Sequence, residues 1–198
     1  MDSRARRTHA LLYAAFWDLI KEQSFDEISV SQLCDTAGVR RATFYRHFSD
    51  KDTFCAAFIH QMRLAVSELI TNTLGANHSL NSYCKKMTEV FADLIVHNEA
   101  VVARQQRAGS LDRLLGIITL EMTYAFADQV RSNSYGSTDR AARSLVDGHE
   151  EGFAAFYIGG LFGLLRKHIS DTSMDGSFDR QAFLKEHRQM VDRLLPEG

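Results

Sequence analysis

The chain has 198 residues, of which 45% are hydrophobic, and its formal net charge is −2 at pH 7. This length suffices for one compact fold or two small ones that share a core, and the composition is ordinary for a globular protein. No uninterrupted apolar run reaches the roughly 18 residues of a transmembrane helix, and the N-terminus lacks the apolar stretch of a signal peptide. We therefore expect a cytoplasmic protein with no membrane partner.

Helical periodicity runs through the whole chain. The single proline, Pro196, lies at the extreme end, and its absence from the interior favours an all-α fold of about nine helices. The first helix is predicted over residues 4–23. Its apolar stripe would pack over the two short helices that follow and consists of Leu11, Leu12, Ala15, Phe16, Leu19 and Ile20.

Two short helical patterns meet at Gly38. Ser29 stands at an N-cap position with Gln32 three residues later, which is the spacing of a capping box. Gly38 ends this helix because glycine tolerates the left-handed conformation of a helix stop. Ser49 is expected to cap the helix that begins after the second pattern. Together the two patterns have the layout of a helix-turn-helix, and duplex DNA is the first partner to consider.

The second short helix is predicted over residues 41–48. At about 100° per residue, Phe44 and Phe48 fall together and face the core. Ala42 and Arg46 point the other way, flanked by Thr43 and Tyr45. A small residue between basic and polar ones suits a helix in a major groove, where arginine can bond bidentately to guanine.

Basic residues are concentrated near this helix. Residues 40–51 contain three arginines and Lys51 against one acid, Asp50. A local basic face is sufficient for DNA, because counterion release depends on the phosphates contacted and not on the net charge. Arg4, Arg6 and Arg7 form a second cluster, which is either a solvated tail or a basic arm on DNA.

Residues 4–51 closely resemble the N-terminal domain of the TetR family of bacterial transcriptional regulators. The resemblance rests on Phe25-x-x-Ile28-Ser29-Val30, on Ala37-Gly38-Val39 at the turn, and on Thr43-Phe44-Tyr45-Arg46-His47-Phe48 before a lysine. It implies base contacts by Arg40, Arg41, Ala42, Thr43 and Arg46. It implies phosphate contacts by Ser29, Ser31, Tyr45, His47 and Lys51. Arg40 departs from the family, which often has a capping residue there, and arginine is a poor N-cap.

The remaining helices follow from apolar spacing and breaks. They are predicted over residues 50–74, 80–97, 98–108, 110–131, 139–169 and 178–195, with a polar loop at 132–138. The helix over 139–169 carries a stripe of small residues, namely Gly148, Gly152, Ala155, Gly159 and Gly163. Each interior glycine costs about 1 kcal/mol relative to alanine, so the stripe indicates a close approach by another element.

Residues 156–168 are similar, more weakly, to the penultimate helix of one subgroup of TetR-like C-terminal domains, which often has tryptophan in place of His168. The resemblance implies that the last two long helices form a four-helix bundle with a second subunit. The implied contacts are Gly152, Ala155, Gly159, Gly163, Phe183, His187, Met190 and Leu194. The alternative is that the glycines make room for helices of the same chain.

The resemblance implies a helix-turn-helix domain over residues 1–49 and a ligand-binding and dimerisation domain over 50–198. The protein would be a cytoplasmic, nucleoid-associated homodimer, by default a repressor, released from a palindromic operator by a small-molecule effector. Candidate effector contacts are Phe58, Met62, Phe91, Met122, Phe126 and Tyr157, which suit an apolar or aromatic ligand, with Glu121 and Gln105 as polar candidates. An apolar stripe is equally typical of plain core.

Two alternatives come from other classes of protein. A TetR-like module that acts through partner proteins without DNA is the stronger, although an intact set of Thr43, Tyr45, His47 and Lys51 argues against it. An enzyme is the weaker, because no cofactor motif or nucleophile motif is present. Asp93 with His97, or the acidic cluster after His149, lacks a third metal ligand. Cys55 and Cys84 are expected to be buried hydrophobes, with redox sensing as the less favoured interpretation.

Overall fold

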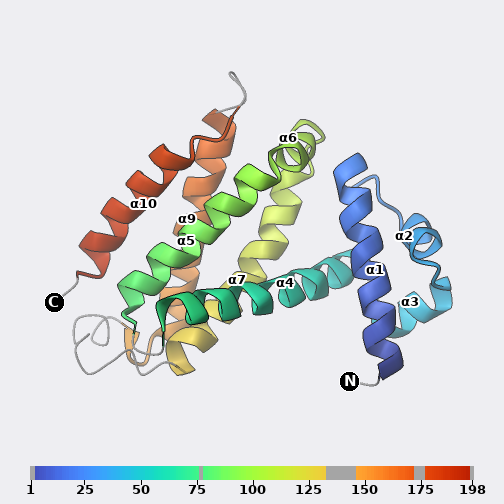
Figure 1. Ribbon diagram of the computed structural model, residues 1–198, viewed down its shortest axis with the longest axis horizontal. Coiled ribbons are helices and arrows are strands. Elements are labelled where there is room, and N and C mark those ends of the chain that lie inside the picture. The colour runs from blue at the N-terminus through green and yellow to red at the C-terminus, as the bar shows by residue number, and fades with distance from the viewer. Residues whose placement is uncertain (1–2, 76–77, 133–145, 172–176, 197–198) are drawn as a thin grey trace. The chain divides into compact units, whose positions relative to one another are not determined.

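The computed structural model describes residues 3–75, 78–132, 146–171 and 177–196. Within these ranges the chain forms nine α-helices and no strand (Figure 1), which confirms the predicted all-α fold. The helices are α1 (Ser3–Glu22), α2 (Val30–Ala37), α3 (Arg41–His47), α4 (Lys51–Leu74), α5 (Leu80–His97), α6 (Glu99–Arg107), α7 (Leu111–Ser132), α9 (Glu150–Asp171) and α10 (Arg180–Leu194). None of these helices combines the length and the hydropathy needed to cross a membrane.

The chain folds into two compact units that do not follow a single cut in the sequence. The first comprises Met1–Gln61 with Ala100–Ile118, and the second comprises Met62–Glu99 with Thr119–Gly198. Helices α4 and α7 therefore each have one end in the first unit and the other end in the second. The expected functional division at residue 49 stays a prediction, since units of packing need not coincide with units of function.

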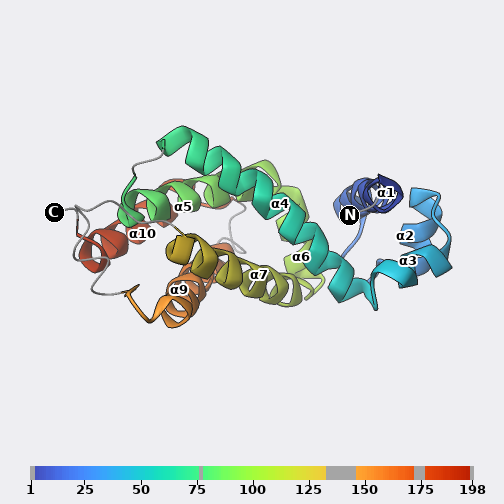
Figure 2. The ribbon, with the colours of Figure 1, turned by 90° about the horizontal axis from the view of Figure 1, so that it is seen from below.

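Aromatic side chains fill the core of the first unit. Helix α1 lies against α2 and α3 (Figure 2). Phe16 makes edge-on contacts with Phe25, Phe54 and Phe58, at ring-centroid distances of 6.2, 5.4 and 5.1 Å. Phe44 reaches the same cluster from α3, with its ring 5.8 Å from that of Phe54. The short helices α2 and α3 are thus fixed by apolar burial, because helices of this length are marginal alone.

Helix ends in the first unit follow most of the predicted signals. The Ser29 side chain accepts a hydrogen bond from the Gln32 backbone N–H at 3.1 Å, and Gly38 adopts φ 64°. Ser49 was expected to cap α4, and this prediction is wrong. Asp50 does so instead: its carboxylate accepts from the Thr53 N–H at 2.7 Å and from the Ser49 hydroxyl at 2.9 Å.

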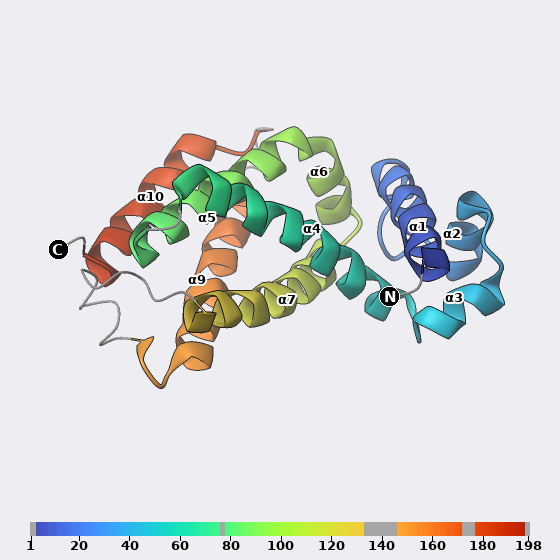
Figure 3. The ribbon, with the colours of Figure 1, turned by 60° about the horizontal axis from the view of Figure 1, so that its bottom comes forward.

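In the second unit, α10 packs against α5 and α9 (Figure 3). A buried polar network joins the three helices. The Nε2 atom of His187 on α10 lies 2.8 Å from the Tyr157 hydroxyl on α9 and 3.1 Å from the Thr88 hydroxyl on α5. Asn81 on α5 donates to the Leu195 carbonyl at 2.6 Å. These bonds satisfy polar groups inside an otherwise apolar interior.

Helix α9 begins later than the sequence indicated. It was expected over 139–169, yet it begins at Glu150. Gly148 adopts φ 78° in the turn that precedes it, a backbone conformation that no helix interior contains. Gly148 is therefore not part of the helical stripe. The predicted loop at 132–138 and the first residues of the expected helix lie almost entirely outside the described residues.

The buried histidine predicts a pH dependence of stability. Burial, and secondarily the charge of Arg188, lowers the pKa of His187 to about 4. The unfolded chain takes up a proton near pH 6.5 and the folded chain does not, so stability is full above pH 6.5 and falls as the pH decreases toward 4. We expect a loss of about 2–4 kcal/mol across this window from His187 alone.

The loss is measured by denaturant unfolding at pH 7.5 and pH 5. His187→Gln should flatten this dependence, whereas His97→Gln, at an exposed site, should leave it as in the wild type. An identical pH profile for the wild type and His187→Gln would contradict the assignment.

Candidate nucleic-acid interface

Helix α3 presents the side chains predicted to read bases. Arg41, Ala42 and Arg46 are exposed, and Thr43 is half-buried on the flank. Phe44 and Phe48 lie in the core and anchor the helix from behind. Arg40 occupies the N-cap position with φ −68° and makes no side-chain capping bond. The arrangement leaves one face of α3 apolar and inward, and the other polar, basic and accessible.

The candidate phosphate contacts surround this face. Tyr45 is exposed, His47 and Ser31 are half-buried, and Ser29 is exposed at the N-cap of α2. Ser29 uses its oxygen to accept from Gln32, so its O–H remains chemically suited to donate to a phosphate oxygen. Hydroxyls and imidazoles at the rim of a recognition helix are typical of groups that hold the backbone.

His47 packs against a second histidine. Its ring lies 5.0 Å from that of His9 on α1, edge to face, and His9 lies 4.9 Å from the Phe48 ring. Burial, followed by the nearby His47, lowers the pKa of His9. His9 is thus held neutral at pH 7 and supports His47 by packing rather than by charge.

Lys51 has a structural role that the sequence did not indicate. Its Nζ donates to the backbone carbonyls of Phe25, Asp26 and Ile28 at 2.6, 3.3 and 2.9 Å, and lies 4.5 Å from the centre of the Phe25 ring. An ammonium group has three donors, and these carbonyls take all three. We therefore leave Lys51 out of the phosphate contacts proposed below.

Gln105 on α6 forms hydrogen bonds with the same connection between α1 and α2. Its side chain is 1% exposed, and its Oε1 accepts from the Phe25 N–H at 2.7 Å and from the Ser110 hydroxyl at 2.8 Å. Its Nε2 donates to the Gln23 carbonyl at 3.2 Å. Sequence reasoning had treated Gln105 as a possible effector contact. A buried amide among helix termini gives no periodic signal, so only the fold could reveal this role.

Arg113 on α7 completes this set of contacts. Its guanidinium pairs with Asp52 on α4 at 2.8 Å and with Asp26 at 2.7 Å, and its Cζ lies 5.4 Å from the Phe25 ring centre. We call the contacts made by Lys51, Gln105 and Arg113 around Phe25 the Phe25 clamp. It ties the connection between α1 and α2, and hence the start of the helix-turn-helix, to α4, α6 and α7.

The six candidate effector residues do not share one site. Phe58 belongs to the core of the first unit, Met62 is 38% exposed, and Phe91 packs on Phe162 with ring centres 5.6 Å apart. Met122 and Phe126 line a small cavity of the second unit. Tyr157 stacks on Phe126 at 5.0 Å and bonds to His187.

The candidate dimer residues divide into two groups. Gly152, Ala155, Gly159 and Gly163 on α9 and Met190 on α10 are exposed, and Leu194 is half-buried. A Cβ atom built on any of those three glycines meets no atom within 4 Å, so the glycines do not make room for helices of the described chain. Phe183 and His187 are buried in the chain's own core, which argues against a direct contact by either with a second subunit.

The cysteines and candidate metal ligands have ordinary structural surroundings. Burial raises the pKa of Cys55 and of Cys84 to about 12, which keeps both thiols protonated and unreactive. Asp93 pairs with Arg180 at 2.6 Å, and the His97 Nδ1 bonds to the Asp93 backbone carbonyl at 2.7 Å. Among the described residues no three His, Cys, Asp or Glu side chains form a group that could hold a metal ion.

Residues 10–58 match the family described as bacterial regulatory proteins, tetR family. An HTH-type transcriptional regulator of Haemophilus influenzae, itself uncharacterised, is 26% identical over 98 residues, which are 50% of this chain and 48% of the relative. The match thus spans about half the length of this curated relative. The family match, over residues 10–58, includes the helix-turn-helix.

Solved structures share the fold of the whole chain. A protein of Mesorhizobium loti assigned to the TetR-family transcriptional regulators superposes with a TM-score of 0.53 at 16% identity, over 98% of each chain. The TetR family repressor AlkX of Dietzia sp., implicated in biodegradation of n-alkanes, gives 0.52 at 15% identity over 94% of each chain. At such identities these likenesses concern the fold alone.

The structural role of Lys51 predicts the effect of removing its ammonium group. Lys51→Met should lower the free energy of unfolding by about 1–3 kcal/mol, because three backbone carbonyls lose a charged donor. Lys21→Met, which removes an exposed pair with Asp18 and an ammonium group 5.5 Å from the centre of the Trp17 ring, should change it by less than about 1 kcal/mol. Denaturant unfolding measures both changes. If Lys51 instead held phosphate, the variant would keep its stability and show a shallower salt dependence of DNA binding.

The buried amide generates a second prediction. Gln105→Leu keeps the volume roughly but removes the acceptor of the Phe25 N–H and the donor to the Gln23 carbonyl, at a cost of about 1–3 kcal/mol. Hydrogen exchange should quicken at Phe25 and its neighbours. Gln61→Leu, at an exposed position of α4 in the same unit, serves as the control. Unchanged exchange at Phe25 in Gln105→Leu would show that the amide does not hold this segment.

Proposed function

We propose that the chain, whose residues 10–58 match the bacterial regulatory proteins of the tetR family, is a homodimeric transcriptional regulator of that family that binds double-stranded DNA. The observation that carries the proposal is the two-sided character of α3. Phe44 and Phe48 lock one face into an aromatic core, and Arg41, Ala42 and Arg46 are accessible on the other. A short helix fixed in this way suits insertion into a major groove.

The base contacts proposed are Arg40, Arg41, Ala42, Thr43 and Arg46. The phosphate contacts proposed are Ser29, Ser31, Tyr45 and His47. Contacts to phosphate fix the position of the protein on the duplex, whereas base contacts supply sequence preference. A dimer with two-fold symmetry would place two copies of α3 in successive major grooves, so the operator would be palindromic.

The accessible face of α9 supports the dimer. Gly152, Ala155, Gly159 and Gly163 leave a shallow surface beside Phe156, whose side chain is 69% exposed. A large exposed aromatic next to a row of small residues is typical of an interface that a second helix fills. We propose that α9, with Met190 and Leu194 of α10, meets its copy in a second subunit.

Regulation would follow from a population shift. A small-molecule effector bound in the second unit would move α4, which continues into the first unit and carries Lys51 and Asp52 of the Phe25 clamp. Helix α7 gives a parallel route, since Arg113 lies near its start. A coupling of about 1–3 kcal/mol would weaken DNA binding several- to about a hundredfold, which is the action of a repressor released by its ligand.

Selection of bound duplexes from a random DNA pool, at a stated salt concentration, tests the function directly. Enrichment of a palindromic site is the expected result. A folded protein that enriches no sequence, and whose residual binding lacks salt dependence, would favour a module that acts through partner proteins. Such a module would keep the fold and the dimer but would not bind DNA.

Removal of a base-reading arginine should relax sequence preference. Arg41→Ala and Arg46→Ala are each expected to cost about 1–3 kcal/mol on the selected site and much less on unrelated duplexes. Arg107→Ala, at an exposed site on α6, is the matched control. Fluorescence anisotropy on matched and mutated duplexes measures the difference. If both variants bind with unchanged affinity and preference, α3 does not lie in the groove as proposed.

A charge on the α9 surface should separate the subunits. Gly159→Glu is expected to yield a folded monomer, because a side chain there meets nothing in its own chain yet would be buried without a partner in a dimer. Gly116→Glu adds the same charge at an exposed helical glycine of α7, and it should leave the dimer intact. Light scattering after size exclusion distinguishes the two, and a Gly159→Glu dimer would place the interface elsewhere.

A further inference from the structure

A small cavity lies inside the second unit between α4, α5 and α7. Its lining includes Arg63, Ser67, Tyr83, Met87, Met122 and Phe126. Its volume is about 20 Å³, which is room for about one water molecule. The described conformation is therefore a closed form of this site.

The polar groups of the cavity are neighbours. Arg63 and Ser67 are one helical turn apart on α4 and so share a face. Ser67 hydrogen-bonds to Tyr83 of α5. Burial raises the pKa of the Tyr83 hydroxyl, and the bond to Ser67 and the charge of Arg63 partly oppose that rise. A guanidinium and two hydroxyls thus belong to an otherwise apolar lining, and the charge of Arg63 is felt at the Tyr83 hydroxyl.

The rest of the cavity lining is apolar, and its side chains can change conformation. Met87, Met122 and Phe126 are all buried, and Phe126 stacks on Tyr157. Methionine is unbranched, so two such side chains can change rotamer and widen the cavity with little strain. Phe126 contributes an aromatic surface to the lining.

Helix α4 has few buried side chains where it lines the cavity. From residue 59 to residue 69 it has no buried side chain, and Leu64 and Leu69 are 46% and 54% exposed. Few apolar contacts hold this stretch, so an outward movement would cost little free energy. Phe58 and Ile70, both buried, fix the helix on either side of it.

We propose that this cavity binds a small monocarboxylate with an apolar or aromatic body. The carboxylate would pair with Arg63 and accept from the hydroxyls of Ser67 and Tyr83, and the body would replace Met87 and Met122 against Phe126. Arginine suits this role because its planar fork matches a carboxylate. The inference rests on the proposed function, since the ligand would be the effector that displaces α4.

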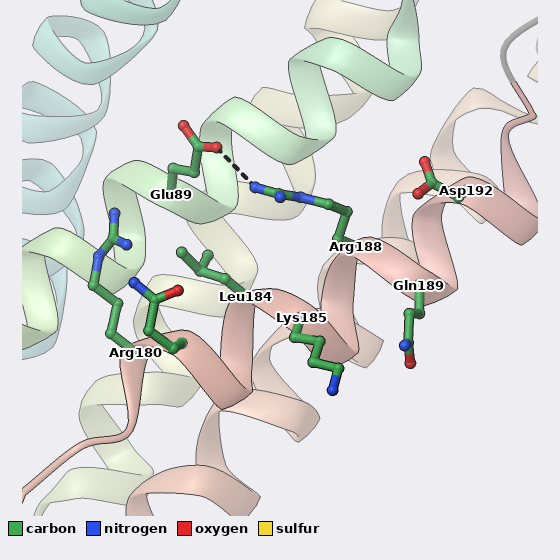
Figure 4. Close-up of a pocket in the computed structure, with 8 residues that line it drawn as sticks. Glu89, Arg180, Leu184, Lys185, Arg188, Gln189 and Asp192 are labelled. Carbon is green, nitrogen blue, oxygen red and sulfur yellow. Dashed lines mark hydrogen bonds and ion pairs between the residues drawn. The ribbon is translucent and has the colours of Figure 1, made fainter.

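A larger hollow in the described part of the second unit does not suit a ligand. It has a volume of about 280 Å³ and lies along α5 and α10 (Figure 4). Arg188 is paired with Glu89 at 3.3 Å and Arg180 with Asp93 at 2.6 Å. Lys185 and Gln189 point away from the Glu89–Arg188 pair (Figure 4), so the polar groups do not converge.

Calorimetric titration with 3-phenylpropionate and octanoate tests the site, with 3-phenylpropanamide and octanamide as uncharged probes of the same shape. The wild type should bind each acid more tightly than its amide. Arg63→Gln should weaken acid binding by about ten- to a hundredfold and leave amide binding nearly unchanged, because only the charged contact is lost. Arg107→Gln is the matched control and should bind as the wild type does. Circular dichroism confirms that each variant is folded.

Three results would overturn the proposal: no binding of any probe to the folded wild type, equal binding of acids and amides, or unchanged acid binding by Arg63→Gln. The effector role is read separately, from release of a pool-selected duplex by the acid. Acid binding with no effect on the bound duplex would leave the site standing and remove its effector role. Acid binding by a protein that selects no duplex would overturn the proposed function alone.

Discussion

The fixed position of Phe25 is the constraint on which the first unit depends. Three side chains from three helices converge on it: Lys51 of α4 on the carbonyls around it, Gln105 of α6 on its N–H, and Arg113 of α7 over its ring. A side chain that satisfies a buried backbone group, as Gln105 does for the Phe25 N–H, is costly to remove, because the freed group has no water to replace it. The connection between α1 and α2 is therefore as well determined as a helix.

The candidate recognition helix inherits its orientation from this arrangement. Helix α3 has seven residues, too few to be stable alone, and two phenylalanines hold it on the cluster that Phe16 and Phe54 continue. Its arginines therefore project from a surface that is rigid although the element is short. Precise placement matters for base reading, since a bidentate contact tolerates little displacement. The same clamp that orders α2 and α3 is built on α4 and α7, both of which continue into the second unit.

The second unit combines a hydrogen-bonded core with an exposed helix face that no described residue of the chain covers. Tyr157, Thr88 and His187 join α9, α5 and α10 by hydrogen bonds that tolerate only one register of the three helices. The outer side of α9 has glycines that touch nothing and an exposed Phe156. This hydrogen-bonded core is thus formed within one chain, whereas the α9 surface is suited to a partner. The thin packing of α4 beside Arg63 is a third feature of this unit, and it permits movement where the core does not.

The sequence by itself determined the helices, their approximate limits and the two faces of α3, because these follow from apolar periodicity, caps and local motifs. It also indicated the resemblance of the N-terminal region to the tetR family, which residues 10–58 match, because the motif is contiguous. It did not reveal that Asp50 caps α4 in place of Ser49, or that α9 begins after Gly148. Several neighbouring residues could have capped or started each of these two helices. Only the tertiary structure decided which of Phe183 and Gly159 is accessible, and only it brought Gln105 to Phe25, 80 positions away. Such contacts depend on how the helices pack in space. The spacing of side chains along one helix does not indicate which distant residue each side chain will contact.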